Sequence, residues 1–265
     1  MLLELFRWLS IDIPGFNVFN YISLRALLAV ITSLLISFCF GGWFIKKLGE
    51  YSLGQHIRTD GPEGHFIKSG TPTMGGGLIL ISIIISTLLW ADLSNSYVWL
   101  LLIVTTSFGL IGLIDDMSKI QKKESDGLSA LQKIILQSIV GIAVVGYLFY
   151  SAKTPQETEL LIPFFKDLSL PLGALSFILL SYLVVVGSSN AVNLTDGLDG
   201  LAIMPAVMVI SALGIFAYVE GNIIFANYLS IPYIEGAGEL TIFCAALAGA
   251  GLGFLWFNAY PAEVF

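Results

Sequence analysis

The chain has 265 residues, of which 56% are hydrophobic and 12% are charged, and its mean hydropathy is +0.87. This composition excludes a soluble globular domain of this length, because such domains carry far more charge. The formal net charge of −7 is acidic, and we expect no nucleic-acid partner for such a chain.

Seven apolar segments approach or reach the length of about 20 residues that a helix needs to cross the roughly 30 Å hydrocarbon layer. We therefore predict an all-α polytopic integral membrane protein, with a single transmembrane domain over residues 1–265. The predicted spans lie at about 22–44, 74–91, 97–114, 131–150, 173–189, 201–219 and 239–257.

The distribution of Lys and Arg in the connections predicts how the chain is oriented. The connections at 45–73 and 115–130 are rich in these residues, whereas the connection at 220–238 has none. We therefore expect the two basic loops in the cytoplasm and the N-terminus outside. The same alternation places residues 190–200 and 258–265 on the cytoplasmic side, so that all four candidate active-site segments converge on one face.

Two expectations concern the external side. Arg25, near the external end of the first span, is expected to extend its charged group towards water while its stem stays in the apolar layer. The segment 219–238 contains Phe225, Tyr228 and Tyr233, a residue mix typical of the headgroup level. It is therefore predicted to hold a short interfacial element.

The loop before the second span is a candidate anion site. Thr73 is expected to cap that helix, and the glycines at 75–77 would let backbone amides approach a ligand. Lys68, a flexible point charge, would suit a phosphate beside those amides. The alternative is a capped helix whose glycines only permit close packing against other helices.

Asp115 and Asp116 end the third predicted span. Neighbouring side chains on a helix point about 100° apart, so the two carboxylates are expected to have different roles. Their repulsion at a low-dielectric boundary predicts either a retained proton or a bound cation. Mg²⁺ fits, because it is typically held by one or two carboxylates together with substrate phosphates. The alternative is a pair that only marks where the span leaves the membrane.

Four polar residues follow the fifth predicted span at intervals of three, namely Asn190, Asn193, Asp196 and Asp199. This spacing makes one stripe on a helix, whereas the Asp-Gly pairs favour turns. Either geometry groups the side chains, whose donors and acceptors suit ring or ribose hydroxyls and base edges. The alternative is a plain loop with two Asp-Gly turns.

The last predicted span ends in the aromatic segment Phe254–Pro261, in which Asn258 is the polar exception and a candidate substrate-binding residue. Taken together, the cytoplasmic segments supply carboxylates, a cation site and a lysine beside a glycine-rich helix start. Phosphate chemistry on a lipid fits these groups best. The lipid phosphate would arrive laterally through the bilayer, and a nucleotide would arrive from the cytoplasm.

Four separated motifs, in order along nearly the whole chain, closely resemble the phospho-N-acetylmuramoyl-pentapeptide transferases, a family of polyprenyl-phosphate sugar-1-phosphate transferases. These motifs are Gly61-Pro62-Glu63 with Thr71-Pro72-Thr73-Met74-Gly75-Gly76, then Asp115-Asp116, then Asn190–Gly200, then Gly253–Pro261.

The resemblance implies transfer of phospho-N-acetylmuramoyl-pentapeptide from its UDP carrier to undecaprenyl phosphate, with Mg²⁺ required and UMP released, in the bacterial cytoplasmic (inner) membrane. It matches Asp115 and Asp116 to carboxylates near the metal and the lipid phosphate. The resemblance also places Lys68 and Thr73 at the nucleotide end of the site, Lys68 as a catalytic residue and Thr73 as a substrate-binding residue. It implies a uridine-binding region formed by Asn193, Asp196, Asp199 and Phe265.

The family continues after a Val-Phe pair such as Val264-Phe265 with a Met-Gly-Asp motif, whose aspartate is a metal ligand, and with further spans. We therefore expect this chain to be an N-terminal fragment, about seven spans of a ten-helix fold, and to be inactive by itself. A homodimer would be unsurprising for this resemblance.

Two other functions remain open at the level of sequence. A related transferase using UDP-N-acetylglucosamine shares the same catalytic logic. An ion-coupled transporter would also place carboxylates and glycine-broken helices in a membrane. The absence of an inverted repeat and the clustering of acidic residues at one face argue against the transporter.

Overall fold

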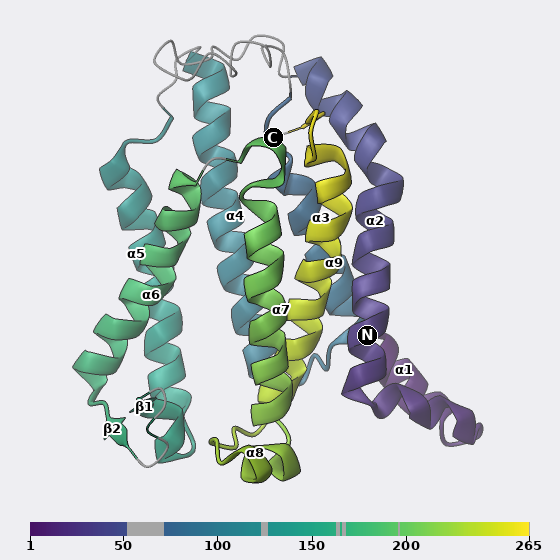
Figure 1. Ribbon diagram of the computed structural model, residues 1–265, viewed down its shortest axis with the longest axis vertical. Helices are drawn as coiled ribbons and strands as arrows, with labels where there is room; N and C mark the ends of the chain where they lie inside the picture. The colour runs from purple at the N-terminus through teal and green to yellow at the C-terminus, as the bar shows by residue number, and fades with distance from the viewer. Residues whose placement is uncertain (52–71, 123–126, 163–164, 166–167, 196, 265) are drawn as a thin grey trace.

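The computed structural model describes residues 1–51, 72–122, 127–162, 165, 168–195 and 197–264 (Figure 1). The elements in chain order are α1 (Leu2–Leu9), the 3₁₀ helix η1 (Pro14–Asn20), α2 (Ile22–Tyr51), α3 (Gly76–Trp90), α4 (Ser96–Lys122), α5 (Ala130–Ser151), η3 (Pro155–Thr158), β1 (Glu159–Leu161), β2 (Ser169–Pro171), α6 (Ala174–Leu194), η4 (Leu198–Gly200), α7 (Ile203–Glu220), α8 (Ile223–Leu229), η5 (Ala237–Glu239) and α9 (Leu240–Asn258).

The prediction of an all-α polytopic membrane protein is confirmed. In the described part of the chain, six helices are long and apolar enough to cross a membrane, namely α2, α4, α5, α6, α7 and the helix that ends at Asn258. The remaining predicted span, the second in chain order at 74–91, corresponds to α3, which has 15 residues and is shorter than these six helices. The only described sheet is a small antiparallel pair in which Leu160 of β1 lies opposite Leu170 of β2.

Helix α9 forms the centre of the bundle, packed against α2, α3 and α7 (Figure 1). Small residues allow this close approach, since a Cβ on Gly249 would collide with Ser33 and the carbonyl of Val30 on α2. One turn later, a Cβ on Gly253 would lie 2.6 Å from Cβ of Ser37. Close contact through small residues is the usual way in which helices associate in membranes.

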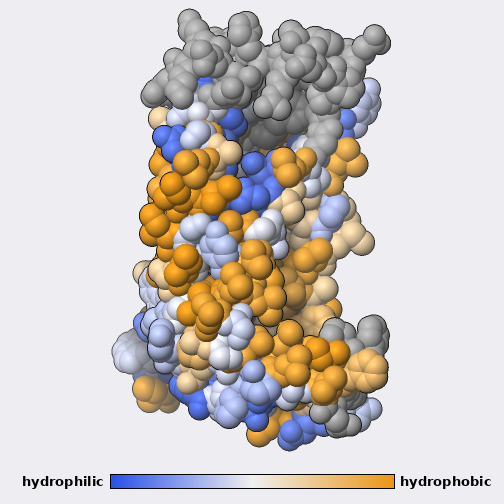
Figure 2. All heavy atoms as spheres, turned by 90° about the vertical axis from the view of Figure 1, so that its left-hand side faces the viewer, coloured by the Kyte–Doolittle hydropathy of each residue, from blue (hydrophilic) through white to orange (hydrophobic). Residues whose placement is uncertain are grey.

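Helices α5 and α6 form a separate pair beside this bundle, and α5 joins it through α4 (Figure 1). The hydroxyls of Ser138 and Tyr182 are 2.8 Å apart across the pair. Figure 2 views the molecule from this side, and apolar residues cover much of the face between more hydrophilic regions towards either end. Such a surface suits contact with lipid chains.

The prediction that Arg25 extends towards water is wrong. Its residue is only 2% exposed, and its two terminal nitrogens donate to the carboxylate of Glu239 at 2.6 and 2.8 Å. The same guanidinium donates to the carbonyl of Trp90, while the backbone N–H of Asp92 donates to Glu239. A buried guanidinium is tolerated when it is paired and hydrogen-bonded in this way.

The segment 219–238, for which a short interfacial element was predicted, contains the short helix α8. Asn222 caps the start of this helix, and its side-chain oxygen accepts from the backbone N–H groups of Ile224 and Phe225. Helix α8 lies at the same end of the bundle as β1, β2 and the start of α2, the helix that carries Arg25 in its first turn (Figure 1). We call this end the α8 end.

Candidate active site

The opposite end of the bundle gathers the segments that the sequence analysis singled out. The ends of α2, α4 and α6, the starts of α3, α5 and α7, and the C-terminus all lie at the top of Figure 1. We call this the Asp115 end. Helix α4 continues to Lys122, so Asp115 and Asp116 lie within a helix and do not mark its end.

Asp115 is buried, and both of its carboxylate oxygens have partners in the protein. The residue is 6% exposed, and its Oδ2 lies 2.9 Å from Nζ of Lys119 and 3.1 Å from Nζ of Lys133. Its Oδ1 accepts a hydrogen bond of 2.8 Å from the backbone N–H of Leu128. A carboxylate at membrane depth is expensive unless it is paired in this way.

Asp116 has a different environment, as the helix geometry predicted. Its side chain is 33% exposed, against 8% for Asp115. Its Oδ1 lies 2.9 Å from Nζ of Lys119, which therefore bridges the two carboxylates. The Asp115 carboxylate is thus held in the protein interior, whereas the Asp116 carboxylate remains accessible to solvent.

The segment before α5 places Lys133 beside Asp115. Ser129 begins the helix with a reciprocal cap, in which its hydroxyl accepts from the N–H of Gln132 and the Gln132 side chain accepts from the N–H of Ser129. Such a capping box fixes where a helix starts. Just before it, Gly127 lies so close to Asp115 that a Cβ would be 2.5 Å from the carboxylate.

A cavity of about 260 Å³ opens beside these groups, between α4, α5 and α6. It is lined by Phe108, Ile111, Gly112, Asp115, Asp116, Lys133, Gln137, Ser189, Val192 and Asn193. The structure therefore brings the predicted residues Asp115, Asp116 and Asn193 into one cavity. Hydrophilic residues on this face of the molecule lie directly below the grey atoms in Figure 2.

Sequence reasoning missed Lys133, Gln137 and Ser189. Lys133 and Gln137 are four residues apart in a predicted span that is mostly apolar, so they share one helix face. Polar residues at this spacing in a predicted span were the available signal. Ser189 gave no comparable signal, because a lone serine is common at interfaces between membrane helices.

Both predicted geometries occur in the segment 190–200. Asn190 and Asn193 lie on the last turns of α6, whereas Asp199 lies in the turn η4. The Asp199 backbone adopts a left-handed conformation with φ +49°, and Gly200 follows at φ +85°. The chain thus reverses direction here between α6 and α7.

Asn258 is buried beneath this turn, at 2% exposure. Its Oδ1 accepts from the N–H of Gly200 at 3.1 Å, and its Nδ2 donates to the carbonyls of Gly197 and Val264. Its carboxamide is therefore occupied by backbone groups. This geometry suits a residue that positions the turn next to Asp199 and ties the C-terminal segment to it.

The expected cap by Thr73 is wrong. Helix α3 has Gly75 at its N-cap without a side-chain hydrogen bond, and Met74 before it has a positive φ of 74°. The Thr73 hydroxyl is buried, and within the described ranges it has no hydrogen-bond partner. A residue two positions before the cap cannot reach the first free N–H groups. The predicted site residues Lys68, Asp196 and Phe265 lie outside the described residues.

Asp115 and Asp116 are oxygen donors of the kind that Mg²⁺ takes. Among the described residues no group of three or more His, Cys, Asp or Glu could hold a metal. Mg²⁺ is, however, commonly held by one or two carboxylates plus substrate phosphates. Lys119 supplies the positive charge between these carboxylates, so a bound Mg²⁺ would have to displace its ammonium.

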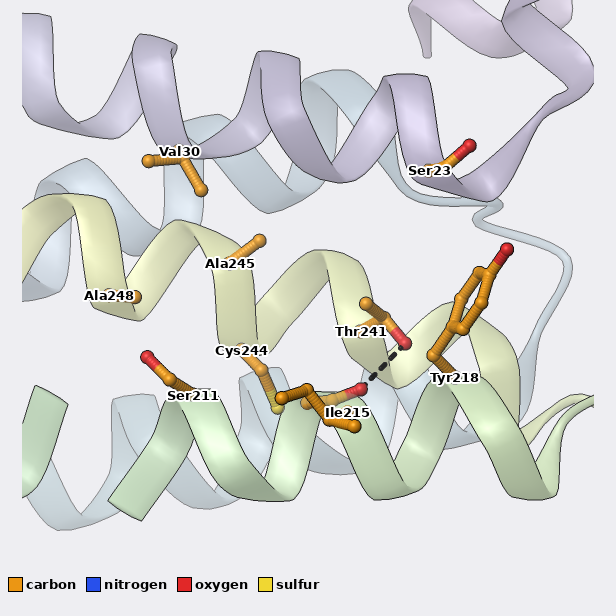
Figure 3. A pocket seen from close by; sticks show the side chains of 10 residues that line it. Ser23, Val30, Ser211, Ile215, Tyr218, Thr241, Cys244, Ala245 and Ala248 are labelled. Carbon is orange, nitrogen blue, oxygen red and sulfur yellow. Dashed lines mark hydrogen bonds between the residues drawn. The ribbon is translucent and has the colours of Figure 1, made fainter. Parts of the chain in front are cut away.

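A second cavity, of about 340 Å³, lies between α2, α7 and α9 (Figure 3). Its lining is mostly apolar surface without charged groups, and the Thr241 hydroxyl donates to the carbonyl of Gly214 at 3.2 Å. None of its lining residues is Asp, Glu, Lys or Arg. It is therefore unsuited to bind phosphates, and the cavity at the Asp115 end is the candidate active site.

The apolar helices and the charged cavity at one end define a polytopic membrane protein with a polar site at the membrane edge. A family model described as glycosyl transferase family 4 matches residues 98–265, more than half of the chain. The chain therefore belongs to glycosyl transferase family 4. It is a transferase of the polyprenyl-phosphate sugar-1-phosphate superfamily, and its activity class is phosphosugar transfer.

Proposed function

We propose that the chain carries part of the active site of an enzyme that transfers phospho-N-acetylmuramoyl-pentapeptide from its UDP carrier to undecaprenyl phosphate. One phosphoanhydride bond of the carrier breaks, a new one forms with the lipid phosphate, and UMP leaves. The site would face the cytoplasm of a bacterial inner membrane. The product would be the first lipid intermediate of peptidoglycan synthesis.

The observation that carries this proposal is the cavity between α4, α5 and α6. It places two carboxylates, the Lys133 ammonium and the Asn193 carboxamide within one space of about 260 Å³. Its position at the edge of apolar helices suits a reaction between a lipid phosphate and a water-soluble donor. Phosphoryl transfer needs mainly positioning and neutralisation of charge, which such groups supply.

Asp115 and Asp116 would hold Mg²⁺, which when bound neutralises charge on the reacting phosphates. Lys133 would bind phosphate oxygens by charge. Asn193 and Asp199 would contact the nucleotide or its sugar, and Asn258 would hold the turn that carries Asp199. The proposal also includes nucleotide contacts that the resemblance implies, made by Lys68, Thr73, Asp196 and Phe265.

The test is Mg²⁺-dependent release of UMP from UDP-N-acetylmuramoyl-pentapeptide in the presence of undecaprenyl phosphate. Both the 265-residue chain and a version extended by the further spans that the resemblance implies are assayed. Activity in either form supports the transferase, and activity only in the extended form assigns missing ligands to the extension. If both forms are correctly folded and inserted in the membrane and neither releases UMP, the proposal is overturned.

The second candidate is transfer of N-acetylglucosamine-1-phosphate from its UDP carrier. Competition between the two UDP donors in the same assay separates the two enzymes, because the preferred donor suppresses UMP release from the other. An ion-coupled transporter is the candidate from another class. Proton- or sodium-dependent uptake without any UMP release would favour it.

A further inference from the structure

Gln137 is a buried polar residue whose role the proposed function leaves open. It lies one turn after Lys133 on α5, lines the same cavity, and is only 5% exposed. A carboxamide carries two donors and an acceptor, and burial without partners is costly. Its hydrogen bonds therefore decide which of these groups faces the cavity.

The orientation of the neighbouring Asn190 is fixed by the backbone of α6. Its Nδ2 lies 2.8 Å from the carbonyl oxygen of Val186. A carbonyl oxygen can only accept a hydrogen bond, so the Asn190 amide must turn its NH₂ group to this side. Rotating the carboxamide by a half-turn would place two oxygens against each other.

Asn190 in turn fixes Gln137. The second hydrogen of the Asn190 NH₂ group is donated to Oε1 of Gln137 at 2.7 Å. Because this atom must accept, the oxygen of Gln137 faces Asn190 and its Nε2 faces the other way. Nε2 lies 3.4 Å from the hydroxyl oxygen of Ser189, another residue of the cavity wall.

This chain of contacts leaves donors at the cavity. Within the described ranges, one N–H of Gln137 makes the long contact with Ser189, and the other has no protein partner. The Ser189 hydroxyl accepts in this contact, so its own hydrogen remains available. The ammonium of Lys133 lies on the same face of α5. One wall of the cavity therefore presents donors, which suits the oxygens of a phosphate.

We propose that Gln137 binds a phosphate oxygen of a substrate through its amide N–H groups, and that Asn190 is a positioning residue that holds the amide in this orientation. The inference rests on the proposed transfer of a phosphosugar. It changes the expected role of Asn190, from direct contact with a substrate to control of the residue that makes the contact.

The test compares variants in whichever form of the protein releases UMP. Gln137→Glu keeps an acceptor for Asn190 but removes both N–H donors, and Gln137→Met removes the whole amide. We expect each to raise KM for one phosphate-bearing substrate about tenfold or more with a smaller change in kcat, since a hydrogen bond to a charged group is lost. A higher KM for undecaprenyl phosphate would mean that Gln137 binds the lipid phosphate. A higher KM for the UDP donor would mean that it binds a phosphate of the nucleotide.

Asn190→Asp tests the positioning role. The new carboxylate cannot donate, so Gln137 would reverse and turn its oxygen to the cavity, and the same KM should rise. In the Gln137→Met background, Asn190→Asp should produce no further rise. The matched control is Ser138→Ala, which removes another polar contact between α5 and α6 outside the cavity, and its KM values should stay within about twofold of wild type.

Unchanged KM values in both Gln137 variants would overturn this inference while leaving the transferase intact. If wild type releases no UMP, the proposed function fails, and binding is then measured directly. At least one of two ligands, undecaprenyl phosphate (with undecaprenol as its control) or the UDP donor, should raise the melting temperature of wild type more than that of Gln137→Met. Equal shifts in the two proteins with both ligands would exclude phosphate binding by Gln137.

Discussion

Arg25 and Glu239 are 214 positions apart in the sequence and meet in a two-point ion pair, with nitrogen–oxygen distances of 2.6 and 2.8 Å. Arg25 lies near the start of α2 and Glu239 lies just before α9. The pair thus joins the two helices that pack most extensively against each other. The pair is also hydrogen-bonded to the end of α3, because Arg25 donates to the carbonyl of Trp90 and Glu239 accepts from the backbone N–H of Asp92.

Replacing Arg25 by Met should strongly destabilise the protein. The change leaves Glu239 as a buried, unpaired charge, and breaking a buried pair in this way typically costs about 3–5 kcal/mol. The melting temperature in detergent should fall clearly, and adding Glu239→Gln to the Met variant should restore part of it, since the orphaned charge is removed.

The matched control for this ion pair is Lys153→Ala. Lys153 and Glu235 form a pair at the same α8 end, but both side chains are 73% exposed. Exposed pairs contribute only about 0.2–1 kcal/mol, so this variant should melt close to wild type. A similar loss in both variants would show that burial does not set the strength of the Arg25 pair.

Asp115 and Asp116 should respond differently to the same substitution. Asp115→Asn removes the buried counter-charge of Lys119 and Lys133, so it should lower both UMP release and thermal stability. Asp116→Asn changes a more exposed side chain that pairs with a single cation, Lys119, among the described residues, so it should lower UMP release with little effect on stability. Measuring both quantities in each variant checks the division of roles, and equal destabilisation would contradict it.

Gly127→Ala should impair the site without altering any charged group. The added Cβ would lie 2.5 Å from the Asp115 carboxylate, so the segment must move away and the Leu128 hydrogen bond is lost. We expect UMP release to fall by at least about tenfold. Gly146→Ala on α5 is the control, because its Cβ meets nothing within 4 Å. Full activity of Gly127→Ala would show that this segment does not position Asp115.

Glu157 should make stability depend on pH at the α8 end. Burial acts to raise the pKa of Glu157, but hydrogen bonds from Thr154, Tyr97 and the N–H of Lys153 outweigh it, so the pKa lies below its ordinary value of 4.5. A lowered pKa in the folded state stabilises the fold above about pH 4.5, and this contribution is lost as the pH falls through the folded pKa.

The measurement for Glu157 is the melting temperature of wild type and Glu157→Gln between pH 7 and pH 3. Wild type should be the more stable at neutral pH, and the two curves should converge on acidification. A constant separation over the whole range would mean that ionisation of this carboxyl contributes nothing. Because Glu157 lies outside the spans, the detergent should affect both proteins equally.

Hydropathy was sufficient to predict the long apolar helices, because an apolar run of membrane length has few alternatives to a helix. It also predicted that the polar segments meet at one end, since alternation of spans fixes the end at which each connection lies. Helix ends were predicted less well. Helix α4 continues past Asp116 to Lys122, and α6 continues to Leu194, because polar residues can extend a helix beyond the apolar layer.

Contacts between distant residues could not be predicted. The partner of Arg25 lies 214 positions away, so local sequence suggested water as the destination of its charge. The hydrogen-bonded pair of Gln137 and Asn190 joins two helices whose register the sequence does not define. The cap expected from Thr73 failed because the positive φ at Met74 turns the chain before the helix begins.

The shortness of α3 has a consequence for the surrounding lipid. Fifteen residues rise about 22 Å, less than the roughly 30 Å hydrocarbon layer. Such hydrophobic mismatch is relieved when the bilayer thins around the helix. Residues 72–75, which precede α3 without being helical, lie at the Asp115 end. We therefore expect the headgroups there to sink towards the cavity, which shortens the path of a lipid phosphate into it.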